Sequence, residues 1–109
     1  MRDIGIKEIK FMFDYSSSCL WDNSGGKNNG IMIEAEEIGL SVIIEDKINQ
    51  WCLKMDNLFT PEIYGGILVR KKILNSNKYR QYKKEQFLLS KLIIKDTGIK
   101  LNIIYEDKI

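Results

Sequence analysis

The sequence predicts an α+β protein that combines a small sheet with two helices. Short segments with alternating apolar residues lie near both ends of the chain, and two long segments with helical apolar spacing follow the first of them. The chain has 109 residues, which is the usual size of one domain, so we expect a single domain over residues 1–109. The pattern predicts a three- or four-stranded sheet with two amphipathic helices packed on one face.

The first half of the chain predicts strands. Residues 6–14 alternate apolar and polar side chains, as a half-buried strand does. Residues 19–21 extend the chain again after a run of serines. The polar, glycine-rich residues 22–30 predict a long turn, because Gly and Asn readily adopt positive φ. Residues 31–33 then predict a return strand, so we expect a long-looped hairpin.

The first helix is predicted to begin after Ser41, a good N-cap residue whose hydroxyl can accept from the first unpaired amides. Apolar residues recur along the next four turns at helical spacing, and the stripe includes Trp51 and Met55. We interpret both as core residues. The helix is predicted to end before Pro61, because the residue before a proline disfavours helical geometry.

The second helix is predicted to begin at Ser76 or Asn77 and to end at Gly98, which suits the left-handed position after a helix. Alternating residues over 99–105 predict a terminal strand. Residues 61–75 allow two interpretations. After a turn at their Gly-Gly pair, they form either an edge strand or the lead-in to the second helix.

Composition argues against most catalytic chemistry. The chain contains no histidine, the commonest general acid and base near neutral pH, so an enzyme is not expected, although carboxylate or lysine chemistry remains open. Two cysteines, Cys19 and Cys52, cannot complete a zinc site without carboxylates. We therefore expect no metal and no cofactor. The cysteines are interpreted as free buried thiols, and a disulfide is the alternative that a reducing cytoplasm disfavours.

No apolar run approaches the roughly 18 residues that a membrane-spanning helix requires. The first eight residues are rich in charge and lack the apolar stretch of a signal peptide. We therefore expect a cytoplasmic protein that has no membrane partner.

Charge is divided unevenly along the chain. Residues 1–62 contain six basic and eleven acidic side chains, a net charge of −5, whereas residues 63–109 contain eleven basic and four acidic ones, a net charge of +7. An acidic surface favours a basic protein partner such as a nuclease. The basic region 70–84 favours nucleic-acid phosphates instead, or is simply a solvated helix face. No RRM, KH or zinc-finger pattern accompanies it.

One segment resembles a known group of proteins. The pattern Phe-x-x-Asp-Tyr-Ser-x-x-x-Leu-Trp over residues 11–21 is similar to the start of a family of small bacterial proteins, in which a strand ends in Asp-Tyr-Gly and a Leu-Trp pair follows. The likeness continues through an acidic segment ending at residue 41 and a helix that closes on residues 55–58. This chain differs by Ser16 in place of glycine and by a basic insert at 63–75.

Proteins of this kind resemble the immunity proteins of contact-dependent growth inhibition and other polymorphic toxin systems. The resemblance implies a protein that binds the C-terminal domain of a cognate toxin and blocks its active site or its access to substrate. Because an acidic surface suits a nuclease, we expect contacts from acidic residues and from aromatic anchors. The candidates are Asp14, Tyr15, Trp21, Asp22, Glu34, Glu36 and Glu37.

Three alternatives stay open. Asp14 and Tyr15 have an equally good structural interpretation, as a turn cap and a ring at the edge of the core. The second alternative is a nucleic-acid-binding accessory protein that uses the basic region 70–84. The third is a carboxylate enzyme, which requires Asp14 to converge with the acids of residues 34–37 in one pocket.

Overall fold

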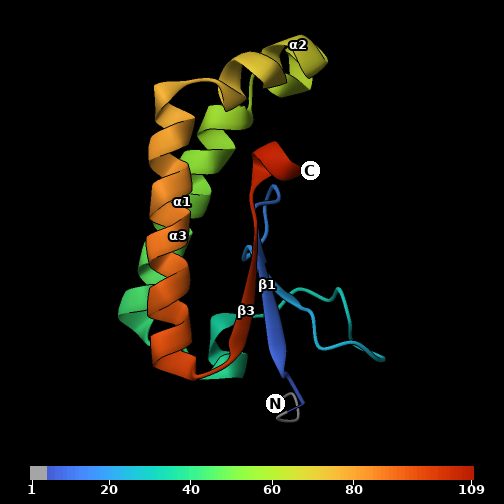
Figure 1. Ribbon diagram of the computed structural model, residues 1–109, viewed down its shortest axis with the longest axis vertical. Coiled ribbons are helices and arrows are strands. Elements are labelled where there is room, and N and C mark those ends of the chain that lie inside the picture. The colour runs from blue at the N-terminus through green and yellow to red at the C-terminus, as the bar shows by residue number, and fades with distance from the viewer. Residues whose placement is uncertain (1–4) are drawn as a thin grey trace.

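The structure is a computed structural model that describes residues 5–109, and it combines a three-stranded mixed sheet with helices (Figure 1). Strands β1 (Glu8–Met12), β2 (Leu20–Asp22) and β3 (Lys100–Ile104) lie in the order β2-β1-β3. β1 pairs with β2 in antiparallel fashion and with β3 in parallel. The predicted α+β fold is confirmed, and the parallel β1–β3 pair joins the two ends of the chain.

Three α-helices lie within the described residues: α1 (Val42–Phe59), α2 (Glu62–Leu74) and α3 (Asn77–Thr97). Two short 3-10 helices, η1 (Ala35–Ile38) and η2 (Glu106–Lys108), flank them along the chain. α1 and α3 form one layer against the sheet, and α2 projects from the upper end of that layer (Figure 1). None of the helices in the described part of the chain is long and apolar enough to cross a membrane.

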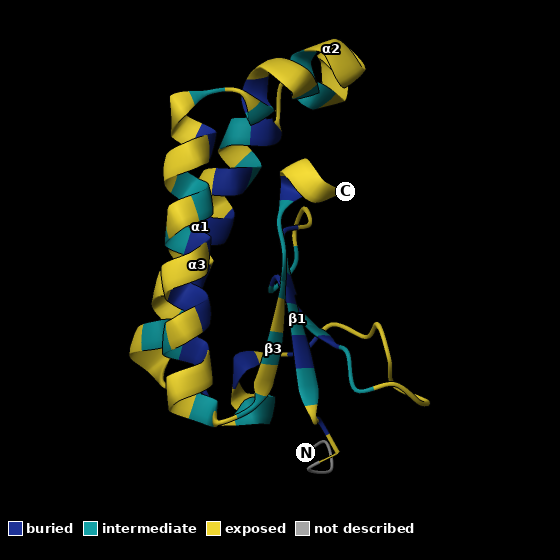
Figure 2. Cartoon of the chain, viewed as in Figure 1, coloured by how far each residue is buried: buried dark blue, intermediate teal, exposed yellow. Residues whose placement is uncertain are grey.

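The core lies between the sheet and the layer formed by α1 and α3, and Figure 2 shows buried residues, in dark blue, in both layers. Ile9 and Phe11 of β1 are fully buried on this side, because alternate residues of a strand point to the same face. The Phe11 ring lies 5.0 Å from the Trp51 ring, centroid to centroid. Trp51 and Met55 are each 1% exposed, so their predicted place in the core is confirmed.

The helix ends follow the sequence closely. Ser76 accepts a hydrogen bond from the backbone N–H of Tyr79 at 3.1 Å, and Gly98 ends α3 with a φ of 69°. Ser41 holds the predicted N-cap position of α1, but its hydroxyl makes no capping hydrogen bond. Its backbone N–H instead donates to the Asp96 carboxylate at 2.7 Å, which ties the start of α1 to the end of α3.

Two segments differ from the prediction. Residues 61–75 are neither an edge strand nor a simple lead-in, because they form the separate helix α2, and Gly66 interrupts it with a φ of 63° and a ψ of −150°. The predicted return strand at residues 31–33 is reduced to a single bridge between Met32 and Trp21. The hairpin therefore exists in shortened form, with hydrogen bonds on both sides of that bridge.

Gln86 of α3 fixes the end of the sheet near α2. Its side chain is buried, and its amide nitrogen donates to the carbonyl oxygens of Phe11 and Ile104, each at 3.2 Å. A buried amide that satisfies two strand carbonyls holds those strands in one arrangement. The candidate site described next is built from the segments that leave β1 and β3 at this end.

Candidate protein-binding site

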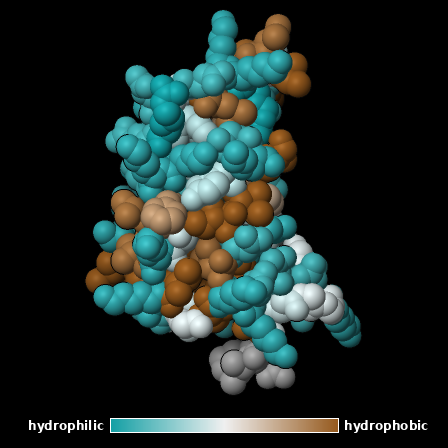
Figure 3. Space-filling model, in the orientation of Figure 1, coloured by the Kyte–Doolittle hydropathy of each residue, from teal (hydrophilic) through white to brown (hydrophobic). Residues whose placement is uncertain are grey.

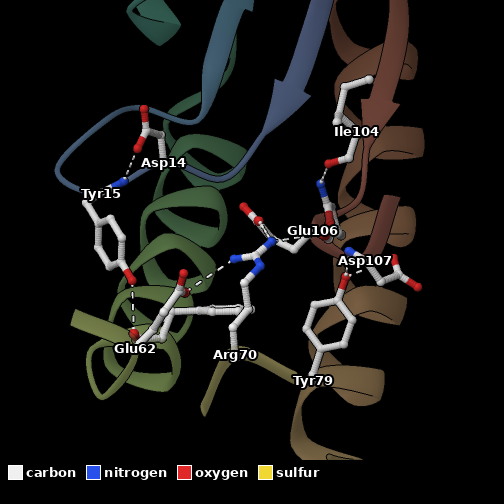
Figure 4. Close-up of polar contacts among 10 residues, drawn as sticks. Asp14, Tyr15, Glu62, Arg70, Tyr79, Ile104, Glu106 and Asp107 are labelled. Atoms are coloured by element: carbon white, nitrogen blue, oxygen red, sulfur yellow. Dashed lines mark hydrogen bonds and ion pairs between the residues drawn. The ribbon is translucent and has the colours of Figure 1, made fainter. Parts of the chain in front are cut away.

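A cleft of about 310 Å³ lies where the loop after β1 meets α2 and η2 (Figure 4). Asp14 and Tyr15 line it from the loop, Glu62 and Arg70 from α2, and Glu106 from η2. These residues are far apart in the sequence, and the folding of the chain back to β3 brings them together. The cleft contains three carboxylates around one guanidinium.

Arg70 lies between two of the carboxylates. One guanidinium nitrogen donates to Glu62 Oε2 at 3.3 Å, and the other donates to Glu106 Oε2 at 2.8 Å. The second nitrogen also donates to the backbone carbonyl oxygen of Glu106 at 3.0 Å. The guanidinium lies 5.5 Å from the centroid of the Phe59 ring, within cation–π range. Arg70 therefore ties α2 to η2 and forms one wall of the cleft.

Glu106 is the buried carboxylate of the cleft. Burial raises the pKa of Glu106, because desolvation destabilises its charged form more than the hydrogen bond and charge of Arg70 stabilise it. The charges of Glu62 and Asp14 also raise the Glu106 pKa. Asp14 is exposed and accepts a hydrogen bond from the backbone N–H of Tyr15 at 2.8 Å. Negative charge therefore exceeds positive charge among these residues.

Tyr15 has the structural role that the sequence offered as one alternative, and it is still partly exposed. Its hydroxyl donates to the carbonyl oxygen of Phe59, at the end of α1, at 2.9 Å, and so satisfies a helix-end carbonyl. Its ring packs edge-on against Phe13 at 5.2 Å. The side chain nevertheless stays 40% exposed. Burial is the main cause that raises the pKa of Tyr15, and the charge of Glu62 raises it further.

η2 is also held against α3, through its own residue Asp107. The Asp107 carboxylate accepts hydrogen bonds from Lys83 at 2.7 Å and from the Tyr79 hydroxyl at 3.1 Å. The Tyr79 hydroxyl also accepts from the backbone N–H of Asp107 at 3.1 Å (Figure 4). The hydrogen bond from Lys83 is the main cause that lowers the pKa of Asp107. Helix α3 therefore anchors η2, and η2 in turn places Glu106 beside Arg70.

An apolar face of α2 is exposed next to the cleft. Its members are large side chains between 65% and 90% exposed: Ile63, Tyr64, Ile67 and Leu68. Brown, apolar atoms gather where this helix projects, at the upper right of Figure 3. Large apolar side chains that cluster on a surface commonly mark an interaction site. We call these four residues the α2 apolar face.

The predicted contact residues fall into different places. Asp14 and Tyr15 line the cleft, as described above. Trp21 is half-buried on the sheet, in register with Lys10, and its indole N–H donates to the carbonyl oxygen of Met12 at 3.1 Å. Met12 lines the cleft, so Trp21 lies next to the cleft but is not part of its lining.

Asp22 requires a correction. It is 3% exposed, and its carboxylate accepts a hydrogen bond from the backbone N–H of Ser24 at 3.0 Å. This is the local turn geometry that an Asp side chain readily forms. Asp22 therefore belongs to the turn after β2, and we remove it from the candidate contacts.

The acids of η1 lie at the other end of α1. Glu34 shares a small pocket with Glu45 and Ile48, near the start of α1, whereas Tyr15 bonds to Phe59 at its end. At 1.5 Å per residue, these two ends of the helix lie about 20 Å apart. Glu36 and Glu37 belong to η1 and therefore lie on that distant side with Glu34. The pocket that would unite Asp14 with the acids of residues 34–37 does not form.

The sequence did not single out Glu62, Arg70 or Glu106 as one site. Glu62 ends the acidic part of the chain, Arg70 and Glu106 belong to its basic part, and no local spacing links Glu106 to the other two. Among residues 5–109 no group of His, Cys, Asp and Glu side chains is arranged to hold a metal ion. The cleft suits a different task, because carboxylates that face an open space can accept a cationic side chain.

Comparisons with protein-family models, with curated proteins and with solved structures found no match to this chain. The features of this chain that bear on its function are the cleft, the α2 apolar face and the sequence resemblance.

Proposed function

We propose that this chain is an immunity protein that binds a cognate bacterial toxin domain and blocks its active site or its access to substrate. The observation that carries the proposal is the acidic cleft beside Tyr15 and the α2 apolar face. The resemblance of residues 11–21 to small immunity-like proteins supports the same function.

The cleft suits a lysine or arginine of the partner. Asp14 is exposed, and among the described residues it makes no ion pair, so its charge is available. Glu62 is partly exposed and shares Arg70 with Glu106. A cation that enters beside Asp14 and Glu62 compensates their negative charge. Complementary charges of this kind raise association rates and set specificity.

The α2 apolar face supplies the other part of such an interface. Aromatic residues that insert into a partner often contribute a large share of the binding energy, and Tyr64 is 90% exposed. An apolar patch next to a charged cleft matches the usual layout of a core surrounded by polar contacts. We therefore place Tyr64 as an anchor and Asp14 as the residue that selects a basic partner.

A nuclease fits this surface best. A nuclease binds phosphates, and proteins that do so concentrate lysine and arginine around the substrate. An acidic cleft that covers such residues competes directly with the nucleic acid. Charge is therefore the property that identifies the partner, and covering its basic residues would block its access to substrate.

The basic region 70–84 supports nucleic-acid binding less well. Arg70 is engaged by Glu62 and Glu106, and Lys83 by Asp107. Arg80 donates to the Asn75 carbonyl oxygen and to the Asn77 side chain. Carboxylates therefore compensate the charges of Arg70 and Lys83, and neutral groups of the chain occupy two donors of Arg80. Strong, salt-dependent binding of the purified protein to unrelated RNA would favour this alternative over the immunity function.

The test uses the toxin domain that the proposal expects to be encoded directly upstream. Co-expression of this chain should protect cells from that domain, and the two proteins should co-purify. Dissociation constants are then measured by calorimetry for Asp14→Lys and Tyr64→Ala. Matched controls are Glu36→Lys, an exposed acid at the distant end, and Leu53→Ala, an exposed apolar residue of α1.

We expect Asp14→Lys and Tyr64→Ala each to weaken binding by roughly 10-fold or more, and both controls to stay within about twofold. Failure of the folded wild-type protein to protect would contradict the immunity function. If Glu36→Lys weakens binding while Asp14→Lys does not, the partner docks on η1 and the assignment of the cleft is wrong.

A further inference from the structure

Cys19 and Cys52 are in direct contact in the core. Their sulfur atoms lie 2.7 Å apart, and the Cys52 thiol donates a hydrogen bond to Cys19. Cys19 is fully buried just before β2, and Cys52 is 7% exposed in the middle of α1. A disulfide bond is about 2.05 Å long, so the sulfur atoms need to approach each other by less than about 1 Å to bond.

The turn before β2 holds Cys19 in this position. Its φ is 63°, a left-handed value that is uncommon for a residue other than glycine. The Ser17 hydroxyl oxygen accepts from the Cys19 backbone N–H at 3.0 Å, and the same hydroxyl donates to the Asp14 carbonyl oxygen at 2.9 Å. An unfavourable backbone conformation persists where the surrounding structure enforces it. The Cys19 thiol is therefore fixed against α1.

We propose that Cys19 and Cys52 are a redox pair that forms a reversible disulfide within one chain. This inference goes beyond the proposed immunity function and does not depend on it. The bond would link the turn that displays Asp14 and Tyr15 to the centre of α1. Its oxidant is a low-molecular-weight disulfide such as glutathione disulfide, and its reductant is the corresponding thiol.

The chemistry starts at Cys19. The hydrogen bond from Cys52 favours the Cys19 thiolate and is the main cause that lowers the pKa of Cys19. The Cys19 thiolate attacks one sulfur of glutathione disulfide, which forms a mixed disulfide and releases one glutathione thiolate. Cys52 then loses its proton and attacks the Cys19 sulfur, which releases the second glutathione. The protein loses two electrons and two protons, and glutathione disulfide gains them.

Access to the pair requires a transient opening of the loop over residues 13–18, because both thiols are buried. Opening limits the rate of oxidation but leaves the position of the equilibrium unchanged. The test therefore measures equilibrium. The full-length protein is incubated to completion in buffers with different ratios of reduced to oxidised glutathione, with and without 8 M urea. The reaction is quenched with acid, and the products are separated by mass.

We expect a product that has lost two hydrogens, that carries no glutathione and that contains a Cys19–Cys52 peptide after digestion. The equilibrium constant for forming the disulfide should be roughly 100-fold larger in the folded than in the urea-unfolded protein. The reason is that a disulfide stabilises the folded state by the same free energy by which folding stabilises the disulfide. The oxidised protein should melt roughly 10 °C higher than the reduced one, and dithiothreitol should reverse the shift.

The variants Cys19→Ser and Cys52→Ser serve as controls, since each should accumulate a stable glutathione adduct and show no rise in melting temperature. Equal disulfide stability with and without urea would overturn the proposal. So would two thiols that stay reduced at equilibrium in strongly oxidising buffer, or oxidation that yields dimers instead of the internal bond. These results concern the wild-type protein, so they decide the matter even if a serine variant fails to fold.

Discussion

Arg70 supplies the positive charge among the described residues that line the cleft, and it is shared by Glu62 and Glu106. Of these two carboxylates Glu106 is the more enclosed, so it depends more on its partner. A charge that is buried without a partner is costly, whereas a buried pair roughly offsets its own desolvation. The contribution of Arg70 is therefore best measured by removing it.

We expect Arg70→Met to lower the free energy of unfolding by about 2–3 kcal/mol at pH 7, because it leaves the Glu106 carboxylate buried without its partner. Urea denaturation measures this change. Lys71→Met, at an exposed neighbouring position, should change stability by less than about 0.5 kcal/mol. The loss at Arg70 should shrink in acid, where Glu106 becomes neutral. A loss that stays constant with pH would show that Glu106 is not its cause.

Individual residues of the cleft were only partly predictable. Asp14 and Tyr15 stand out because an acid and an aromatic ring follow a strand abruptly. Glu62 and Glu106 do not stand out, because an isolated acid at the start of a helix or after a strand is common on any surface. Their role arises when β3 pairs in parallel with β1 and carries η2 to Arg70. The apolar periodicity of the chain does not predict this contact between Glu106 and Arg70.

The elements themselves were better predicted than the site. β1, α1 and α3 each bury one side, and Leu101 of β3 packs against the core, so their apolar residues repeat with the period of a strand or helix. α2 was missed because its large apolar residues are exposed and its Gly-Gly pair is typical of a turn. Apolar periodicity reveals how an element packs, and in α2 only Val69, Ile73 and Leu74 pack against the core.

Gly66 determines the shape of α2. Its φ of 63° and ψ of −150° lie in a region that glycine alone occupies readily. A Cβ added at this position would meet no atom within 4 Å, so a substitution is opposed by the backbone conformation and not by crowding. The interruption separates the first turn of α2, which contains Glu62, from the turns that contain Arg70.

We expect Gly66→Ala to lower the free energy of unfolding by about 1–3 kcal/mol, because alanine is strained in this conformation. Chemical denaturation provides the measurement. The control is Ile67→Ala, at an adjacent residue that is 70% exposed, which should stay within about 0.5 kcal/mol of wild type. A Gly66→Ala protein that is as stable as wild type would mean that α2 straightens, and the geometry of the Glu62–Arg70 pair would then need revision.

The molecule is elongated, with extents of 42 × 28 × 20 Å, and its two ends differ in chemistry. The cleft and the α2 apolar face lie at the end where α1 finishes, and the η1 acids lie where α1 begins. The charge division seen in the sequence does not survive as two separate faces, because Arg70 and Lys100 from the basic half pair with Glu62 and Glu8 from the acidic half. Folding therefore mixes the charges that the chain order separates.

Folding also shifts two adjacent carboxyl groups in opposite directions. Burial raises the pKa of Glu106, whereas the hydrogen bond from Lys83 lowers the pKa of Asp107. A pKa that is raised by folding gives stability that is present in acid, below the pKa of the unfolded state. This stability is lost as pH rises through the pKa of the folded state. A pKa that is lowered by folding gives stability that is present above the pKa of the unfolded state, which is about 4 for an Asp side chain. This stability is lost as pH falls through the pKa of the folded state.

This opposition predicts the pH dependence of two neutral variants. Asp107→Asn should be less stable than wild type by about 0.5–1 kcal/mol at pH 7, a modest value because the pair is partly exposed, and this difference should shrink as pH falls toward 2.5. Glu106→Gln should change in the other direction, gaining stability relative to wild type by a similar amount as pH rises from 3 to 7, because glutamine avoids the cost of the buried charge. Urea denaturation at both ends of this range measures the two slopes, with Asp46→Asn on the exposed face of α1 as the control. Slopes of the same sign for the two variants would contradict the assignment of burial to Glu106 and of pairing to Asp107.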